Sequence, residues 1–142
     1  MTLLDSFALI AFALDERAAS EVEKLLRSSD AEITSVNFAE VVDVLERVKG
    51  FDSLDVHEVL DPLLAGALTV RPVTEAHAWR AAELRTRYYH RSSAALSMGD
   101  CIFLASATPE SALATADPVV ARTARSEGLN LIALPDSQGR RP

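Results

Sequence analysis

The sequence predicts an α/β fold: a mainly parallel central sheet of about five strands, flanked by helices on both faces. Short apolar runs with strand character alternate along the chain with longer stretches of helical periodicity. Strands separated by helices need crossover connections, and these give parallel sheets covered on both sides. A chain of 142 residues suits one domain with one core.

The expected elements follow one another without a repeat or a break in composition. The expected strands are residues 2–4, 31–36, 67–73, 111–115 and 130–134. The expected helices are residues 7–14, 16–28, 38–48, 55–65, 74–90, 97–107 and 118–128. Residues 1–134 therefore form the domain, and residues 135–142 form a polar C-terminal tail that we expect to fray.

Two helices carry informative patterns. Apolar residues from Phe38 to Val48 recur at i, i+3, i+4 and i+7, and Gly50 ends that helix. In residues 74–90 an apolar stripe includes His77, which predicts a buried histidine. Trp79 is expected in the core or in an interface.

Composition and charge narrow the class of protein. The chain is 49% hydrophobic and 25% charged, as in folded soluble proteins, and has no run of about 20 apolar residues. The N-terminus lacks the basic region of a signal peptide, and Asp5 interrupts its apolar run, so we expect a cytoplasmic protein. The single cysteine, Cys101, excludes an internal disulfide and a multi-cysteine zinc site. The net charge of -7 argues against a generic nucleic-acid coat protein.

Four acidic residues lie where strands give way to helices. Asp5 follows the first strand, and Glu40 lies in the first turns of the helix after the second strand. Asp100 begins the apolar helix at 97–107, and Asp117 ends the run ALATAD before Pro118. Because parallel topology brings such junctions to one edge of the sheet, the four carboxylates should converge.

Each acid also has a structural explanation. Asn37-x-x-Glu40 and Ser97-x-x-Asp100 match the capping-box spacing, with Asp for the usual Glu or Gln in the second. Asp117 before a proline is a normal N-cap, and Asp5 is placed to cap the helix that starts near Ser6. Acids near helix N-termini also gain about 0.3–1 kcal/mol from the macrodipole.

A cluster is harder to explain by capping, because like charges repel and a cap needs no neighbours. Clustered carboxylates are what Mg²⁺ requires, and a bound ion can activate water against a phosphodiester. We therefore expect Asp5, Asp100 and Asp117 to bind a metal directly or through water, and Glu40 to bind through water or to assist deprotonation. Four hydroxyls beside the acids are expected to orient ligands or water: Ser6, Thr34, Ser35 and Thr115.

Other charged residues carry open alternatives. Asp43 lies one turn after Glu40 and is either an auxiliary ligand or the partner of Arg47. The segment 79–91 holds Arg80, Arg85, Arg87 and Arg91 with interleaved tyrosines. It is an RNA-binding patch, a solvated helix end or a dimer contact.

Four segments resemble, in the family's order, the motif blocks of PIN-domain ribonucleases, and most closely VapC-type toxins of bacterial toxin–antitoxin pairs. They are LLDSFALIAFAL, ITSVNFAEVVDVL, LSMGDCIFLASA and ALATADPVVARTA. The resemblance covers the chain from Met1 to about Leu134. It implies a parallel sheet flanked by helices, Mg²⁺- or Mn²⁺-dependent endoribonuclease activity, a homodimer, and inhibition by a small VapB-type antitoxin.

The family's acids fall on Asp5, Glu40, Asp100 and Asp117, and its hydroxyl falls on Thr115. Some relatives carry a further acid two residues after the last one, where this chain has Val119. A second metal ion would therefore be weakly held.

Three other classes of protein are alternatives to a nuclease. Phosphoryl-transfer receivers need a late lysine, but none follows Lys49, and aspartate-nucleophile phosphatases need an acid at position 7, which is Phe7. The third is a non-catalytic protein-interaction module on the same fold, with the acids serving only as caps. The apolar helices at 7–14, 38–48 and 55–65 favour a groove for a partner helix and a dimer face.

Overall fold

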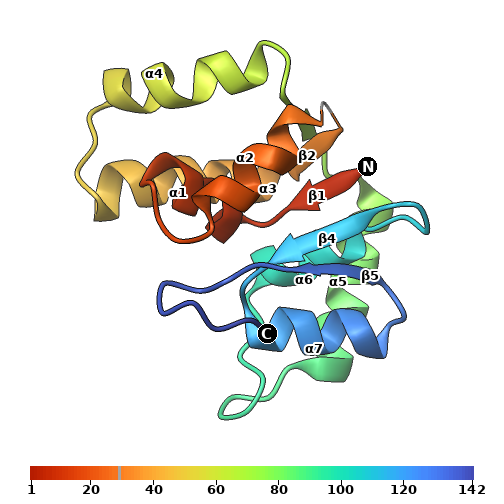
Figure 1. Cartoon of the computed structure of the whole chain (residues 1–142). Helices are drawn as coiled ribbons and strands as arrows, with labels where there is room; N and C mark the ends of the chain where they lie inside the picture. The colour runs from red at the N-terminus through yellow and green to blue at the C-terminus, as the bar shows by residue number, and fades with distance from the viewer. Residues whose placement is uncertain (29) are drawn as a thin grey trace.

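A five-stranded parallel sheet organises the molecule (Figure 1). The computed structural model describes residues 1–28 and 30–142. The strands lie in the order β3-β2-β1-β4-β5, and every neighbouring pair is parallel. Their bounds are β1 Thr2–Leu4, β2 Ala31–Thr34, β3 Leu68–Arg71, β4 Ala112–Thr115 and β5 Asn130–Ala133. The predicted fold class is confirmed.

Helices cover both faces of the sheet, as predicted. In Figure 1, α1 (Ser6–Ala13), α2 (Ala19–Arg27), α3 (Ser35–Asp43) and α4 (Ser53–Leu64) lie on one side. On the other side lie α5 (Glu75–Tyr88), α6 (Met98–Ala105) and α7 (Pro118–Ser126). Each helical layer packs on its own face of the sheet and forms a hydrophobic core there. Adjacent residues of β1 point to the two cores: Leu4 packs on the α1–α4 side and Leu3 on the α5–α7 side. No helix among the described residues is long and apolar enough to cross a bilayer.

Local capping decides where the second strand ends. The sequence predicts a strand to residue 36, but the Thr34 side chain accepts the Asn37 N–H at 3.1 Å and begins α3 there. Helix α3 continues into a π-helical turn, η1 (Val44–Val48), which the periodicity does not reveal. Gly50 then closes the segment at a φ of 77°, as predicted.

Helix α5 corrects the prediction for His77 and narrows the one for Trp79. Trp79 is 68% exposed, so the core alternative is wrong and the interface alternative stays a prediction. His77 is only half-buried, because its Nδ1 accepts the Thr74 N–H at 3.2 Å in a capping box. Ala81 and Leu84 are buried, which confirms the middle of the predicted stripe.

The C-terminal tail does not fray as predicted. The Asp136 carboxylate accepts the backbone N–H groups of Gln138 and Arg140, at 2.9 and 2.8 Å. Arg141 pairs with Glu21 of α2 at 2.6 Å. A turn closed by Asp136 and one ion pair therefore hold the tail against the domain.

The topology marks one place for a site. From the central strand β1 the chain first builds β2 and β3 on one side, then crosses to β4 and β5 on the other. In open α/β sheets, ligands bind beyond the carboxyl ends of the strands where the direction of growth reverses. Here that position is the edge between β1 and β4, where Asp5 and Asp117 follow their strands.

Candidate functional site

Asp5 lies at the end of the central strand and is 8% exposed. Its Oδ1 accepts the Ala8 N–H at 2.7 Å and so caps α1, while its own N–H donates to the Ala114 carbonyl at 3.2 Å. The Thr115 side chain is a further hydrogen-bond partner of the carboxyl group. Asp5 is therefore locked to both β4 and α1.

Asp117 comes from the neighbouring strand. It caps α7, with Oδ1 accepting the Val119 and Val120 N–H groups at 2.7 and 2.9 Å. Its own N–H donates to Thr115 Oγ1 at 3.0 Å. Thr115 is fully buried and contacts both acids, and its role in orienting ligands stays a prediction.

Asp100 enters from α6. It forms the predicted capping box, in which Asp100 Oδ2 accepts the Ser97 N–H at 2.7 Å and Ser97 Oγ accepts the Asp100 N–H at 3.0 Å. The neighbouring Gly99 lies in ordinary van der Waals reach of the Glu40 side chain, so the start of α6 packs beside α3. The charge of Glu40 also contributes to the raised pKa of Asp100, as expected for neighbouring carboxylates.

Glu40 is fixed by a relay of polar side chains, in which the sequence predicts orienting hydroxyls at Ser6 and Thr34 but does not reveal Asn37. Thr34 Oγ1 donates to Asn37 Oδ1 at 2.6 Å, Asn37 Nδ2 donates to Ser6 Oγ at 3.0 Å, and Ser6 Oγ donates to Glu40 Oε2. Asn37 is 2% exposed. Since its amide is oriented by Thr34, the Ser6 proton is directed to Glu40.

The capping box predicted for Asn37 and Glu40 is therefore wrong. Thr34 is the N-cap, and Asn37 lies one turn into α3 with Glu40 a turn further on. The only signal that could have identified the relay is the polar run Thr34-Ser35-x-Asn37 before an apolar helix. Ser35 is exposed, and no hydrogen bond between described residues joins it to the four acids.

The four carboxylates influence one another. Burial is the main cause that raises the pKa of Asp5 to about 7, and the charges of Asp100 and Asp117 add to the shift. Burial also raises the pKa of Asp100, with further contributions from Asp117 and Glu40. None of the ion pairs among the described residues involves any of the four acids.

Capping does not use up these carboxylates. In three of the acids, only one carboxylate oxygen accepts a hydrogen bond from the described residues. These oxygens are Asp100 Oδ2, Asp117 Oδ1 and Glu40 Oε2. The other oxygen of each carboxylate has no donor among the described residues. Capping and metal binding are thus compatible at the same residue.

The donor set fits a hard divalent cation. Four carboxylates that repel one another, without a cationic side chain paired to them in the described chain, are suited to Mg²⁺ or Mn²⁺. In the described residues no three such side chains are close enough to hold an ion as they stand. Binding would therefore include water ligands, which Mg²⁺ usually keeps.

A family comparison decides what kind of domain carries this site. The model for the PIN domain family matches residues 2–126. The chain belongs to the PIN domain family. Among curated proteins, none is matched by this sequence.

Solved structures share the PIN fold of this chain. VapBC2 from Rickettsia felis, bound to a DNA fragment from their promoter, is 18% identical with a TM-score of 0.69, covering 94% of this chain and 98% of that chain. FitAcB from Neisseria gonorrhoeae is 23% identical with a TM-score of 0.63, covering 93% and 96%. FitAB bound to the IR36 DNA fragment is 20% identical with a TM-score of 0.62, covering 93% and 94%. At these identities the likeness concerns the fold.

The arginines predicted to bind RNA are largely engaged within the PIN domain. Arg80 and Arg87 both pair with the Glu127 carboxylate, at 2.6 and 2.8 Å. Arg85 donates to the Leu96 carbonyl at 2.7 Å. Arg91 is exposed. Most of this patch therefore fastens α5 to its neighbours.

Asp43 is the partner of Arg47, which is the second of the two alternatives that the sequence predicts for it. Arg47 donates to both of its carboxylate oxygens, at 2.8 and 2.6 Å, and this pairing lowers the pKa of Asp43. The residue is thus satisfied on the helix surface.

Replacing Asp5 with Asn should remove a pH dependence of stability. Because the folded-state pKa of Asp5 is raised to about 7 from 3.8, its contribution to stability is present below pH 4 and is lost as the pH rises through 7. In EDTA at pH 8, Asp5→Asn should therefore raise Tm by several degrees, since about 1 kcal/mol shifts Tm by ~4 °C in such a domain. Calorimetry from pH 5 to 8 measures this.

The matched control is Asp43→Asn, which removes an acid whose pKa is lowered by Arg47. This variant should keep the wild-type decline of Tm at high pH. Parallel Tm profiles for wild type and Asp5→Asn would contradict the assignment of the pH dependence to Asp5.

Replacing Asn37 with Ala should destabilise the domain by about 1–3 kcal/mol, because Thr34 and Ser6 each lose a buried hydrogen-bond partner. Urea unfolding measures this loss. Gln138→Ala, in the exposed C-terminal turn where only the backbone N–H of Gln138 donates a hydrogen bond, should change the free energy of unfolding by about 0.5 kcal/mol or less. Equal losses in the two variants would speak against the relay.

Proposed function

We propose that this PIN domain is a Mg²⁺-dependent endoribonuclease, with Mn²⁺ as a substitute, that hydrolyses RNA phosphodiester bonds. The observation that carries the proposal is the convergence of four carboxylates at the edge between β1 and β4, without an ion-pair partner in the described chain. PIN domains are generally nucleases, which supports the same reaction class.

The residues would divide the work by position. Asp5, Asp100 and Asp117 would hold the ion directly or through water, because they come from three elements and face the switch point. A bound Mg²⁺ ion would acidify water and stabilise negative charge on phosphate oxygens. Position 119 is a valine, so a second ion would depend on substrate phosphate.

Glu40 would act on the attacking water. Its Oε2 accepts the Ser6 hydroxyl, which leaves Oε1 to receive a proton. Water would then form a new bond from oxygen to phosphorus, and the bond to the leaving oxygen of the RNA chain would break. That oxygen takes its proton from solvent, and Glu40 returns its proton to solvent. Asn37 is a positioning residue in this scheme.

The biological role we propose is that of a cytoplasmic toxin of the VapC type, inhibited by a VapB-type antitoxin. Its fold is shared by chains in structures of VapBC2 and FitAB. Exposed apolar side chains offer two docking regions. Val48, Leu54 and Leu64 lie on the α3–α4 side, which we assign to the antitoxin.

The second docking region lies on the opposite helical layer. Trp79, Tyr89 and Met98 are 68%, 43% and 47% exposed, and we assign them to a homodimer contact. This assignment keeps the interface alternative that the sequence predicts for Trp79.

Purified protein should cut single-stranded RNA with Mg²⁺ or Mn²⁺ and stop when a chelator is added. Asp100→Asn should lower the cleavage rate by on the order of 10²–10³, because it removes a charge directed at the ion. Asp43→Asn is the control, and it should keep near-wild-type activity because Asp43 is paired with Arg47. Full activity of Asp100→Asn would sink the proposed site.

Induced expression in a bacterial host tests the toxin role. Wild type should arrest growth and produce new RNA ends, whereas Asp5→Asn should do neither. If wild type neither arrests growth nor shifts in Tm with Mg²⁺, the alternative of a non-catalytic interaction module holds instead.

A further inference from the structure

The C-terminal turn forms one wall of a cleft beside the carboxylate site. The cleft has a volume of about 510 Å³. One wall consists of Phe7 from α1 with Ala116, Asp117 and Pro118 from the β4–α7 junction. The facing wall consists of Asp136, Arg140, Arg141 and Pro142. Asp117 therefore belongs to both the acid cluster and this cleft.

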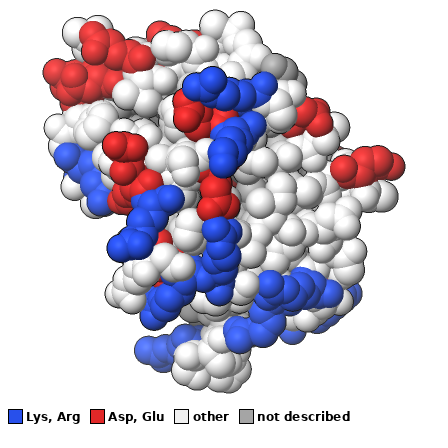
Figure 2. Space-filling model, viewed as in Figure 1, with Lys and Arg blue, Asp and Glu red and all other residues white. Residues whose placement is uncertain are grey.

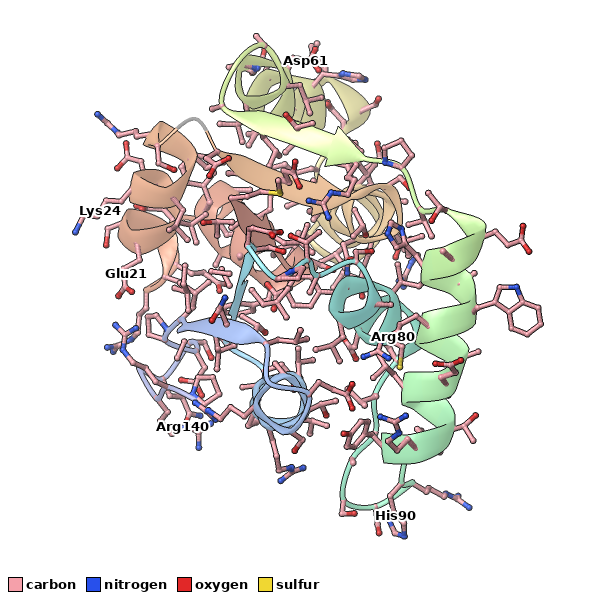
Figure 3. The ribbon with its side chains drawn as sticks, turned by 90° about the vertical axis from the view of Figure 1, so that its right-hand side faces the viewer. Glu21, Lys24, Asp61, Arg80, His90 and Arg140 are labelled. Atoms are coloured by element: carbon pink, nitrogen blue, oxygen red, sulfur yellow. The ribbon has the colours of Figure 1, made fainter. Side chains whose placement is uncertain are left out.

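The turn that carries these arginines is rigidly held. Asp136 accepts two backbone N–H groups and also the Nε of Arg140, at 2.9 Å. Arg125 of α7 donates to the Pro142 carbonyl at 2.9 Å. Figure 3 labels Arg140 beside α7, on the side of Glu21 and Lys24 and away from Arg80 on α5.

Arg140 differs from Arg141, which also lines the cleft, and from the predicted RNA-binding residues Arg80, Arg85 and Arg87, each of which gives a terminal nitrogen to a protein acceptor. Its Nε is used by Asp136, but no acceptor in the described chain receives a hydrogen bond from either of its terminal nitrogens. Arg141, by contrast, donates its two terminal nitrogens to Glu21 and to the Ala133 carbonyl. The side chain of Arg140 is 73% exposed, so an oriented guanidinium fork is open to solvent.

Fork geometry of this kind suits a phosphate. Arginine donates parallel hydrogen bonds to phosphate oxygens, and a fixed guanidinium loses little freedom on binding. The negative charge of Asp136 is offset by its three donors, which also keep the pKa of this carboxyl low.

The charge distribution favours the same side of the molecule. Residues 1–70 hold 14 acidic and 5 basic side chains, whereas residues 71–142 hold 7 acidic and 9 basic side chains. Figure 2 shows Lys and Arg gathered over the lower part of the molecule, where α7 and the C-terminal segment lie in Figure 1. Arg17 adds a positive charge to this region, since its side chain lies beside Gly139 of the C-terminal turn. A net-acidic protein thus has a basic approach to its acidic site.

We propose that this cleft binds a phosphate of single-stranded RNA next to the bond that is cut, with the terminal nitrogens of Arg140 as its ligands. This inference rests on the proposed ribonuclease function and adds a substrate-binding residue to it. Phe7 and Pro118 provide an apolar wall against which the adjoining sugar or base can pack.

The test compares Arg140→Ala with Arg27→Ala. Arg27 is the matched control, because it is 76% exposed and pairs with an acid four residues away, as Arg140 does, but it lies at the far end of α2. RNA binding is measured by fluorescence anisotropy of a labelled single-stranded oligonucleotide, with Asp100→Asn in every protein to prevent cleavage. Cleavage by the corresponding active proteins gives KM and kcat.

Arg140→Ala should weaken binding about fivefold or more and reduce the slope of log K against log salt by about 0.7, the value for one phosphate contact with a single strand. Its KM should rise while kcat changes little. Arg140→Lys should restore part of the affinity and most of the salt slope, which separates loss of the charge from disruption of the turn. Arg27→Ala should match the parent protein.

The outcomes separate the two proposals. If the active protein cuts RNA but Arg140→Ala keeps the parent affinity, KM and salt slope, the phosphate site is wrong and the ribonuclease function stands. If Arg140→Ala weakens binding but the active parent cuts no RNA, Arg140 is a phosphate ligand, but its place next to a cut bond and the ribonuclease function both fail. Absence of RNA binding by the Asp100→Asn parent would overturn the site.

Discussion

The burial of Asp5 at the end of the central strand is the constraint on which the rest of the site depends. A carboxylate at this depth needs donors, and Ala8 and Thr115 provide them from α1 and β4. Those contacts fix the start of α1 and join it to the neighbouring strand. Its raised pKa, mainly a consequence of burial, is the electrostatic cost of holding the group there without a counter-ion among the described residues.

The other three acids are stabilised in a similar way, by hydrogen bonds to one carboxylate oxygen. Asp100 and Asp117 each give one oxygen to the N-terminus of their helix, and Glu40 gives one to Ser6. The second oxygen of each has no protein donor among the described residues. A helix cap and the metal site that we propose are therefore compatible, because a carboxylate has two oxygens and the caps need only one.

Basic residues are used in two different ways. On α5, Arg80 and Arg87 converge on Glu127, so their charge holds two helices together. In the C-terminal turn, Asp136 holds only the Nε of Arg140 and leaves the rest of the fork open. The number of arginines in a segment therefore says less about nucleic-acid binding than the partners that the fold assigns to each guanidinium.

The sequence alone determined the alternation of strands and helices, the parallel sheet and the junction positions of the four acids, because hydrophobic period and capping signals are local. It also indicated the PIN family through motifs in a fixed order. Only the tertiary structure revealed the relay through Asn37, the exposure of Trp79 and the ordered turn around Asp136. These features depend on contacts between segments far apart in the chain, such as Ser6 with Asn37 and Arg141 with Glu21. Local patterns contain no information about which distant side chain completes a hydrogen bond.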